Sequence, residues 1–176
     1  MAETVRGQIL IAAPSLFDYF RRSVVLVLEH TEEGAMGVVL NRSSETPVAE
    51  AVPALAELAD AEDLVRLGGP VAPESVVALG DFEDLSDAGL RVVGSLGTLD
   101  PDRTNASLRR MRVYAGYAGW APGQLDGEIE QGAWIVEDAD VEDPFRDGDL
   151  WSDALRRKGT TAYSLLATMP ADPSLN

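Results

Sequence analysis

The chain has 176 residues, of which 45% are apolar and 25% are charged. This length is typical of a single domain, and the composition excludes disordered, collagen-like and coiled-coil proteins. Thirty acidic residues against fourteen basic ones give a net charge of −16 at pH 7. A field of this sign repels phosphate backbones and anionic lipids, so we expect no direct nucleic-acid binding and no membrane association.

The residue types that are missing exclude several chemistries. The sequence has no cysteine, which excludes disulfides, thiolate nucleophiles and cysteine metal sites. Its first residues lack the pattern of an export signal, and no apolar run is long enough to span a membrane. We therefore expect a cytoplasmic protein.

Two motifs suggest a ligand site at first sight but are predicted to be structural or solvated. The Gly-Gly-Pro turn at 68–70 lacks the following Lys and Ser or Thr of a phosphate loop. The acidic stretch 137–149 has carboxylates at alternate positions from Asp138, but Asp143 stands where a calcium loop requires glycine. We therefore expect no metal and no cofactor.

In chain order, the first elements predict a β-hairpin. Apolar runs at Gln8–Ala13 and Ser23–Glu29 predict two strands, the second covered on both faces because five of its consecutive residues are apolar. The polar segment 31–34 has the length of a hairpin loop, and Ala35–Leu40 predicts the returning strand. This register pairs His30 with Ala35 and brings Asn41 close to the start of the preceding strand.

The rest of the chain predicts short strands between short helices. Strands are expected at Leu64–Leu67, Val76–Leu79, Leu90–Val93, Arg112–Gly119 and Ala133–Val136. Helices are expected from Thr46-Pro47 with a break at Pro53, from Asp100 to about Met111, from Pro122 to near Gly132, and from Asp149 to a stop at Gly159. The residues from about 168 predict an irregular tail. These elements are neither regularly alternated nor grouped in blocks, so we predict one α+β domain, 1–176, built on a mixed sheet.

The weak catalytic candidates are Glu29, His30 and Glu128. His30 is the only histidine, so a histidine proton shuttle must use it. Successive side chains on a strand point to opposite faces, which argues against a Glu29–His30 dyad. The favoured alternative is a histidine that hydrogen-bonds backbone groups near the hairpin tip.

Ligand-binding candidates lie in two places. Asn41 and Arg42 group with Arg21 and Arg22, whose guanidinium groups clamp an anion or, in the favoured alternative, pair with surface carboxylates.

The second place is the segment from Gly116 to Glu128. Tyr117 and Trp120 follow a strand of small residues and could stack on a flat ligand. Gln124 and Glu128 are four residues apart and share one helix face. Tight backbone packing around a core tryptophan explains the same residues equally well, so both interpretations stay open.

Three stretches together resemble a known family. They are Gly7-Gln-Ile-Leu-Ile-Ala-Ala-Pro14 with Phe20-Arg-Arg-Ser-Val24, the hairpin from Leu28 to Arg42, and Gly116-Tyr-Ala-Gly-Trp-Ala-Pro-Gly-Gln-Leu-Asp-Gly-Glu-Ile-Glu130. This sequence is similar to the YqgE/AlgH family of bacterial proteins over nearly its whole length. The resemblance implies an α+β fold with a bifurcated sheet closing towards a pseudo-barrel, and cytoplasmic residence. It implies no reaction, because the family's historical link to transcriptional control is not a demonstrated molecular activity.

Two functional hypotheses follow. The first is a non-enzymatic regulatory domain that binds a small ligand or a protein partner and is linked at most indirectly to transcriptional control. The alternative is a hydrolase-type enzyme in which Glu29 or Glu128 acts as general base, since a carboxylate base needs no histidine. The sequence leaves the partner and the oligomeric state open.

Overall fold

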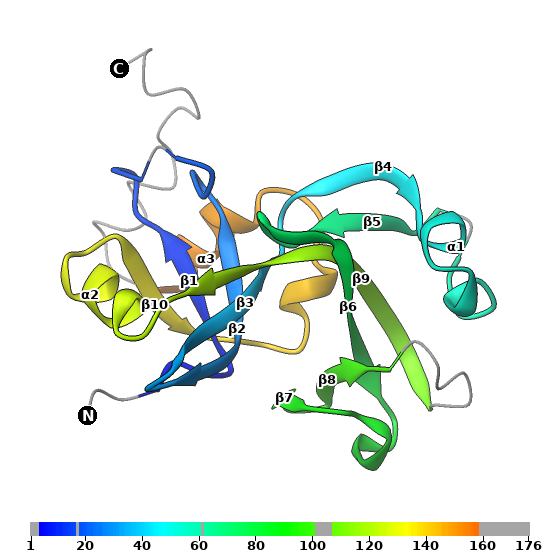
Figure 1. Cartoon of the computed structure of the whole chain (residues 1–176). Coiled ribbons are helices and arrows are strands. Elements are labelled where there is room, and N and C mark those ends of the chain that lie inside the picture. Colours follow the sequence, from blue (N-terminus) through cyan, green and yellow to red (C-terminus); the bar gives the residue numbers. More distant parts are fainter. Residues whose placement is uncertain (1–3, 17, 61, 101–106, 159–176) are drawn as a thin grey trace.

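The computed structural model describes residues 4–16, 18–60, 62–100 and 107–158, and Figure 1 shows their arrangement. The strands are β1 (Gln8–Ala12), β2 (Val24–Thr31), β3 (Gly34–Val39), β4 (Ser43–Pro47), β5 (Leu64–Leu67), β6 (Val71–Phe82), β7 (Arg91–Val93), β8 (Leu96–Leu99), β9 (Leu108–Trp120) and β10 (Trp134–Asp138). The helices are α1 (Val48–Ala51), α2 (Gln124–Glu130) and α3 (Leu150–Lys158), with single 3-10 turns η1 (Pro53–Leu55), η2 (Leu85–Asp87) and η3 (Asp143–Phe145).

The strands form one sheet that divides in two at β9. Its order is β10-β1-β2-β3-β9-β6-β8-β7, while β5 pairs with β9 and β4 pairs with β5. The last residues of β9 pair with β3, whereas its earlier part pairs with β6 and β5, so β9 crosses from one half of the molecule to the other (Figure 1). Only the β5–β9 pair is parallel within the described ladders. The α+β class and the mixed, bifurcated sheet are therefore confirmed.

The two ends of the sheet, β7 and β10, are not joined by a ladder among the described strands. β7 nevertheless comes close to the start of β1. The Arg6 guanidinium donates a hydrogen bond to the Arg91 carbonyl oxygen, and a Cβ on Gly7 would lie 2.9 Å from the Val92 carbonyl oxygen. The sheet therefore curves without closing into a barrel.

Glycines permit the close approach of β9 to the turn that follows β5. Gly116 has a φ of +72°, and a Cβ there would lie 2.5 Å from the carbonyl oxygen of Gly69. A Cβ on Gly69 would lie 2.2 Å from the Tyr117 carbonyl group. Real Cβ atoms do not tolerate such approaches, so these positions require glycine for backbone packing. The Gly-Gly-Pro turn thus has the structural role expected from the sequence.

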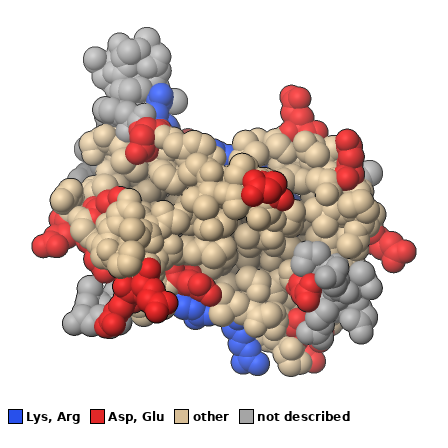
Figure 2. Space-filling model, viewed as in Figure 1, with Lys and Arg blue, Asp and Glu red and all other residues tan. Residues whose placement is uncertain are grey.

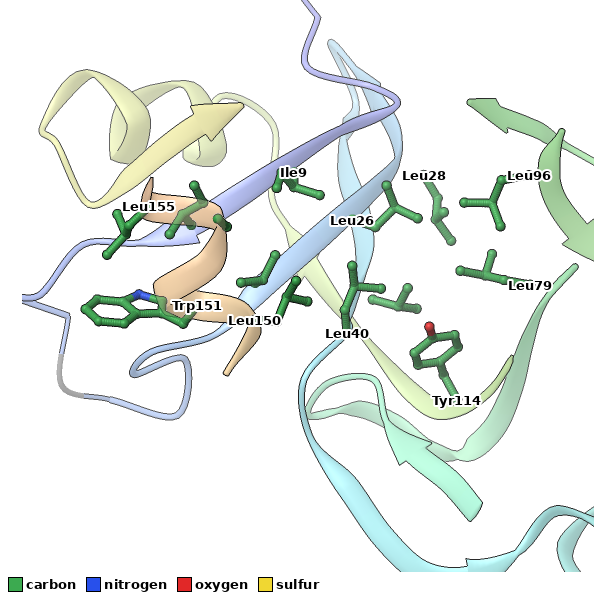
Figure 3. Close-up of a cluster of buried hydrophobic side chains, with 14 residues drawn as sticks. Ile9, Leu26, Leu28, Leu40, Leu79, Leu96, Tyr114, Leu150, Trp151 and Leu155 are labelled. Atoms are coloured by element: carbon green, nitrogen blue, oxygen red, sulfur yellow. The ribbon is translucent and has the colours of Figure 1, made fainter. Parts of the chain in front are cut away.

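Three apolar clusters hold the sheet and helices together. The central cluster extends from α3 to β6 and β8 and contains Ile9, Ile11, Val24, Leu26, Leu28, Val38, Leu40, Leu79, Leu96, Tyr114, Leu150, Trp151, Ala154 and Leu155 (Figure 3). The α2 cluster contains Val5, Leu10, Ala12, Val25, Val27, Val39, Ala118, Trp120, Leu125 and Trp134. The α1 cluster contains Val48, Leu55, Val65, Ala78, Phe82, Leu99, Met111 and Val113.

β2 shows how the sequence produces this arrangement. Val24 and Leu26 enter the central cluster, whereas Val25 and Val27 enter the α2 cluster. Alternating side chains on one strand therefore fill two cores. Each fully buried Val or Leu contributes about 1.5–3 kcal/mol of burial free energy, so the prediction that this strand is covered on both faces is confirmed.

Most predicted elements are present, with three corrections. The segment 43–47 forms β4, so Thr46 does not cap a helix, and the helix beginning at Val48 has no side-chain cap. The strand β8 was not expected. Leu108–Met111 begins β9 instead of ending a helix, and the preceding residues 101–106 lie outside the described part of the chain.

The helix α3 begins as predicted. The Asp149 carboxylate accepts hydrogen bonds from the backbone N–H of Ser152 at 3.1 Å and from its hydroxyl at 2.6 Å. Gly159 and the expected irregular tail lie outside the described residues. In the described part of the chain, no helix is both long and apolar enough to cross a membrane.

Candidate functional site

His30 is held by both of its ring nitrogens. Its Nδ1 accepts a hydrogen bond from the Val5 backbone N–H at 3.0 Å, and its Nε2 lies 3.1 Å from an Asp126 carboxylate oxygen. The imidazole is 6% exposed. Since Nδ1 is the acceptor, Nε2 carries the proton toward Asp126. This is the backbone-bonding histidine expected near the hairpin tip, and it ties the N-terminal segment and α2 to β2.

Glu128 joins the two tryptophans of the α2 cluster. One carboxylate oxygen accepts a hydrogen bond from the Trp120 indole N–H and another from the Trp134 indole N–H, both at 3.0 Å. The other oxygen accepts one from the Gln124 amide at 2.9 Å. Phe20 packs against both indole rings. We refer to Glu128 and the two tryptophans as the Trp–Glu clasp.

The clasp resolves the interpretation of this segment residue by residue. Trp120 is 7% exposed and Trp134 is 3% exposed, so their rings belong to the core. Gln124 closes the α2 turn by accepting a hydrogen bond from the Ala121 backbone N–H at 2.9 Å. The carboxylate, amide and indole groups therefore fasten α2 to the sheet.

Asn41 and Arg42 lie at the other end of the hairpin. The Asn41 side chain accepts a hydrogen bond from the Val24 N–H at 3.0 Å and donates one to the Arg22 carbonyl oxygen at 2.9 Å. Arg42 donates to the Arg21 carbonyl oxygen at 3.3 Å and stacks over the Tyr19 ring at 4.4 Å. The structure therefore brings these residues together, as expected, and uses them to fix the start of β2.

Arg22 contacts Trp151 on α3 and Asp149, the residue that precedes α3. Its guanidinium lies 4.0 Å from the centre of the Trp151 ring and 3.9 Å from an Asp149 carboxylate oxygen. It also adopts a φ of +55°, which is uncommon for a residue with a side chain. These contacts fit the surface-pairing interpretation of the arginines.

Of the candidate site residues, Glu29, Tyr117 and Trp120 line an open groove. The remaining candidates do not contribute to its lining. The groove has a volume of about 460 Å³ and is lined by Glu29, Thr31, Glu33, Gly34, Ala35, Met36, Val71, Tyr117, Gly119 and Trp120. After Gly116, side chains of β9 alternate: Ala118 and Trp120 enter the α2 cluster, whereas Tyr117 packs at the margin of the central cluster. Tyr117 and Trp120 therefore do not form one stacking site.

A second hollow continues the groove along β6. It has a volume of about 310 Å³ and shares Glu29 and Met36 with the first. Its remaining lining residues are Leu28, Val76, Val77, Ala78, Leu90, Thr98 and Leu99. We call the two hollows together the hairpin groove. Their volumes lie in the range of ligand sites in proteins.

The charged residues that line the hairpin groove are acidic: Glu33 lines the first hollow, and Glu29 lines both. No Lys or Arg contributes to either hollow. Among the described residues, neither carboxylate has an ion-pair partner. On the face shown in Figure 2, basic atoms are confined to the upper and lower parts of the molecule, and acidic atoms are distributed around it.

Two buried carboxylates outside the groove, Asp81 and Asp143, have lowered pKa values. Burial alone would raise the pKa of Asp143, but hydrogen bonds from Arg157, Asp140 and Arg146 outweigh it and lower this pKa. Asp81 behaves in the same way: Ser95 and Arg110 lower its pKa despite burial. These carboxylates stabilise the fold, and the described residues contain no cluster of His, Asp and Glu that could hold a metal ion.

Comparison with known proteins identifies the family. A family model described as AlgH-like matches residues 9–163. The chain belongs to the AlgH-like family. A UPF0301 protein of Streptomyces coelicolor is 42% identical over 98% of this AlgH-like chain and 96% of its own length, and one from Mycobacterium tuberculosis is 42% identical over 99% and 93%.

Solved structures show the same fold. A crystal structure of a Corynebacterium diphtheriae protein matches 96% of this AlgH-like chain and 94% of its own, with a TM-score of 0.84 and 33% identity. The solution structure of the AlgH protein from Pseudomonas aeruginosa covers 97% and 98%, with a TM-score of 0.67 and 27% identity. These descriptions name no reaction and no ligand, so function has to be argued from the site.

Proposed function

We propose that this AlgH-like chain is a non-enzymatic binding protein whose hairpin groove takes a ligand with a cationic group and an apolar part. The observation that carries the proposal is the composition of the groove. Glu29 and Glu33 supply negative charge, and Met36, Val71 and Tyr117 supply apolar surface in the same hollow. An apolar site with a few placed charges is the usual character of a binding pocket.

The charge of the whole chain supports the same ligand class. A net charge of −16 attracts cations over long distances and raises the rate at which they meet the groove. Direct binding to nucleic acid is disfavoured by the same field, so in this proposal any link to transcription runs through a protein or a small ligand. We also propose cytoplasmic residence, which is what the resemblance to the AlgH-like family implies.

Hydrolysis with a carboxylate base remains a prediction that no observation of the site favours. The Glu128 carboxylate already accepts three hydrogen bonds, and His30 is engaged through both ring nitrogens. Glu29 is exposed in the groove, so it is the candidate base that solvent and substrate can reach. A carboxylate base of this kind needs a positioned acid or oxyanion donor to act efficiently.

The experiment uses a fluorescent cation with an apolar ring, dansylcadaverine, and measures its binding by fluorescence. Glu29→Lys reverses the charge in the groove, whereas Glu57→Lys makes the same change at an exposed site outside it. We expect Glu29→Lys to weaken binding by about tenfold and Glu57→Lys to leave it within about twofold, because only the first charge lies at the site. Equal effects of the two substitutions would contradict the proposal.

A further inference from the structure

One wall of the hairpin groove is an edge of β6 that no described strand covers. β6 pairs with β9 at Val71 and again from Val76 to Phe82, but β8 covers only Ala78–Asp81 on the opposite side. No described strand pairs with the preceding residues of β6 on that side. Burial changes at the same point, since Val71 is 37% and Val76 is 39% exposed whereas Ala78 is 3% exposed.

The open edge is shaped by a local irregularity. The register with β9 shifts between Val71 and Val76, and Ala72 has a φ of +45°. Pro73 has no backbone N–H to offer. Bulges and prolines are common devices against edge-to-edge association, and they restrict pairing here to the part from Glu74 to Val77. That length suits a short added strand rather than a second sheet.

We propose that the groove binds an extended segment of a partner protein that contains Lys or Arg and apolar residues, and that this segment adds as a strand to the Glu74–Val77 edge of β6. The inference rests on the proposed function and names its partner. Backbone hydrogen bonds to an open edge supply affinity, and side chains in flanking pockets supply specificity. The hairpin groove provides both features, because the hollow lined by Glu33 and the hollow lined by Val76 share Met36.

Charge selects this occupant over a second copy of the chain. The carboxylates of Glu29 and Glu33 favour cationic side chains, whereas Val76, Leu90 and Leu99 in the second hollow favour apolar ones. Two copies that each carry a charge of −16 repel one another. A basic segment gains both local and long-range attraction, and its binding should weaken with added salt.

The test uses a fluorescently labelled peptide of alternating Lys and Val, followed by fluorescence anisotropy with the full chain. The double variant Glu29→Gln/Glu33→Gln removes both carboxylates of the groove, and Glu45→Gln/Glu57→Gln removes the same total charge from exposed sites outside it. We expect about tenfold weaker binding for the first variant and a change within about twofold for the second.

Backbone pairing is tested with two further peptides, N-methylated at every Lys or at every Val. An added strand directs the N–H groups of alternate residues toward the edge, so one of the two peptides should lose about tenfold in affinity and the other should bind like the parent. If neither loses affinity, strand addition is wrong, while a groove effect of Glu29→Gln/Glu33→Gln would leave the proposed function standing.

Two other outcomes overturn the inference. If an alternating Glu and Val peptide binds as tightly as the Lys and Val peptide, charge does not select the partner. If sedimentation shows a dimer of the chain that the peptide dissociates, the occupant of the edge is a second copy. If the two glutamine variants bind the peptide equally, the hairpin groove is not the site and the proposed function fails as well.

Discussion

Replacing Glu128 by Ala tests the structural role of the Trp–Glu clasp. The substitution removes the acceptor shared by two indole N–H groups whose side chains are 7% and 3% exposed. A buried donor left without a partner costs about 1–3 kcal/mol. Two such donors give a sum of about 2–6 kcal/mol, and the half-buried position of Glu128 lets water satisfy part of it. We therefore expect a loss of about 2–4 kcal/mol in the free energy of unfolding.

The assay is urea unfolding followed by tryptophan fluorescence and by far-ultraviolet circular dichroism. A lower midpoint with an unchanged denaturant slope reports lost stability rather than a changed unfolded state. The matched control is Glu130→Ala, which removes the same charge from an exposed position of α2. Glu128→Gln keeps one oxygen acceptor and should fall between the two.

The reasoning would be refuted if Glu128→Ala lay within about 0.5 kcal/mol of Glu130→Ala, the range of ordinary surface substitutions. Such a result would mean that the indole groups find other partners. Glu128 would then not be needed to hold the two tryptophans, and the hypothesis that it acts as a general base would be favoured again.

Three further predictions use the same urea assay. Gly116→Ala should lower the free energy of unfolding by more than about 3 kcal/mol, because residue 116 has a positive φ and its new Cβ would lie 2.5 Å from a carbonyl oxygen. Gly127 has open space around it, so Gly127→Ala should stabilise α2 by about 0.5–1 kcal/mol. Tyr114→Phe should leave the free energy of unfolding unchanged or raise it by about 1 kcal/mol. The reason is that the buried hydroxyl, which points into the central cluster (Figure 3), has no hydrogen-bond partner among the described residues. A loss of more than about 1 kcal/mol would reveal a partner. Asp143→Asn should lower the free energy of unfolding by about 2 kcal/mol at pH 7. Because the native pKa of Asp143 is lowered, this difference from wild type should be fully present above about pH 4 and should shrink as the pH falls through the native pKa. A difference that does not change with pH would contradict the ion-pair account.

Local patterns were sufficient to predict the hairpin. The short loop after Thr31 fixes the register that pairs His30 with Ala35. A bulge between Val27 and Glu29, which the sequence did not predict, shifts this register by one residue, and Asn41 still reaches Val24 through a side-chain hydrogen bond. The cap formed by Asp149 is equally local, since side chain and backbone lie three residues apart. Features of this kind depend on a few neighbouring residues and are therefore accessible from one sequence.

The errors have physical causes as well. Asp100-Pro101 is a strong helix start signal, yet the residues from Leu108 alternate between two faces of a strand: Arg110 reaches Asp81 on one face, and Met111 enters the α1 cluster on the other. Alternation with a period of two was present in the sequence, but the arginines obscured it. Tertiary pairing with β6 decided the outcome.

The hairpin groove could not be predicted because its walls are distant in sequence. Glu29 and Met36 come from the hairpin, Val71 from the start of β6 and Tyr117 from β9. Their proximity depends on the bifurcation of the sheet and on the close approach of Gly69 to Gly116. One signal was available: the period of a strand places Tyr117 and Trp120 on opposite faces, which separates the groove residue from the core residue.

The most direct test of the central claim is an amide chemical-shift map of the isotopically labelled chain, titrated with the Lys and Val peptide at moderate salt. The account predicts that the shifts are concentrated in Glu29–Met36, Val71–Val77 and Tyr117–Gly119, which surround the hairpin groove. Shifts concentrated at Asn41 and Arg42, or spread evenly over the acidic surface, would contradict it and show that the groove is not where the chain binds its partner.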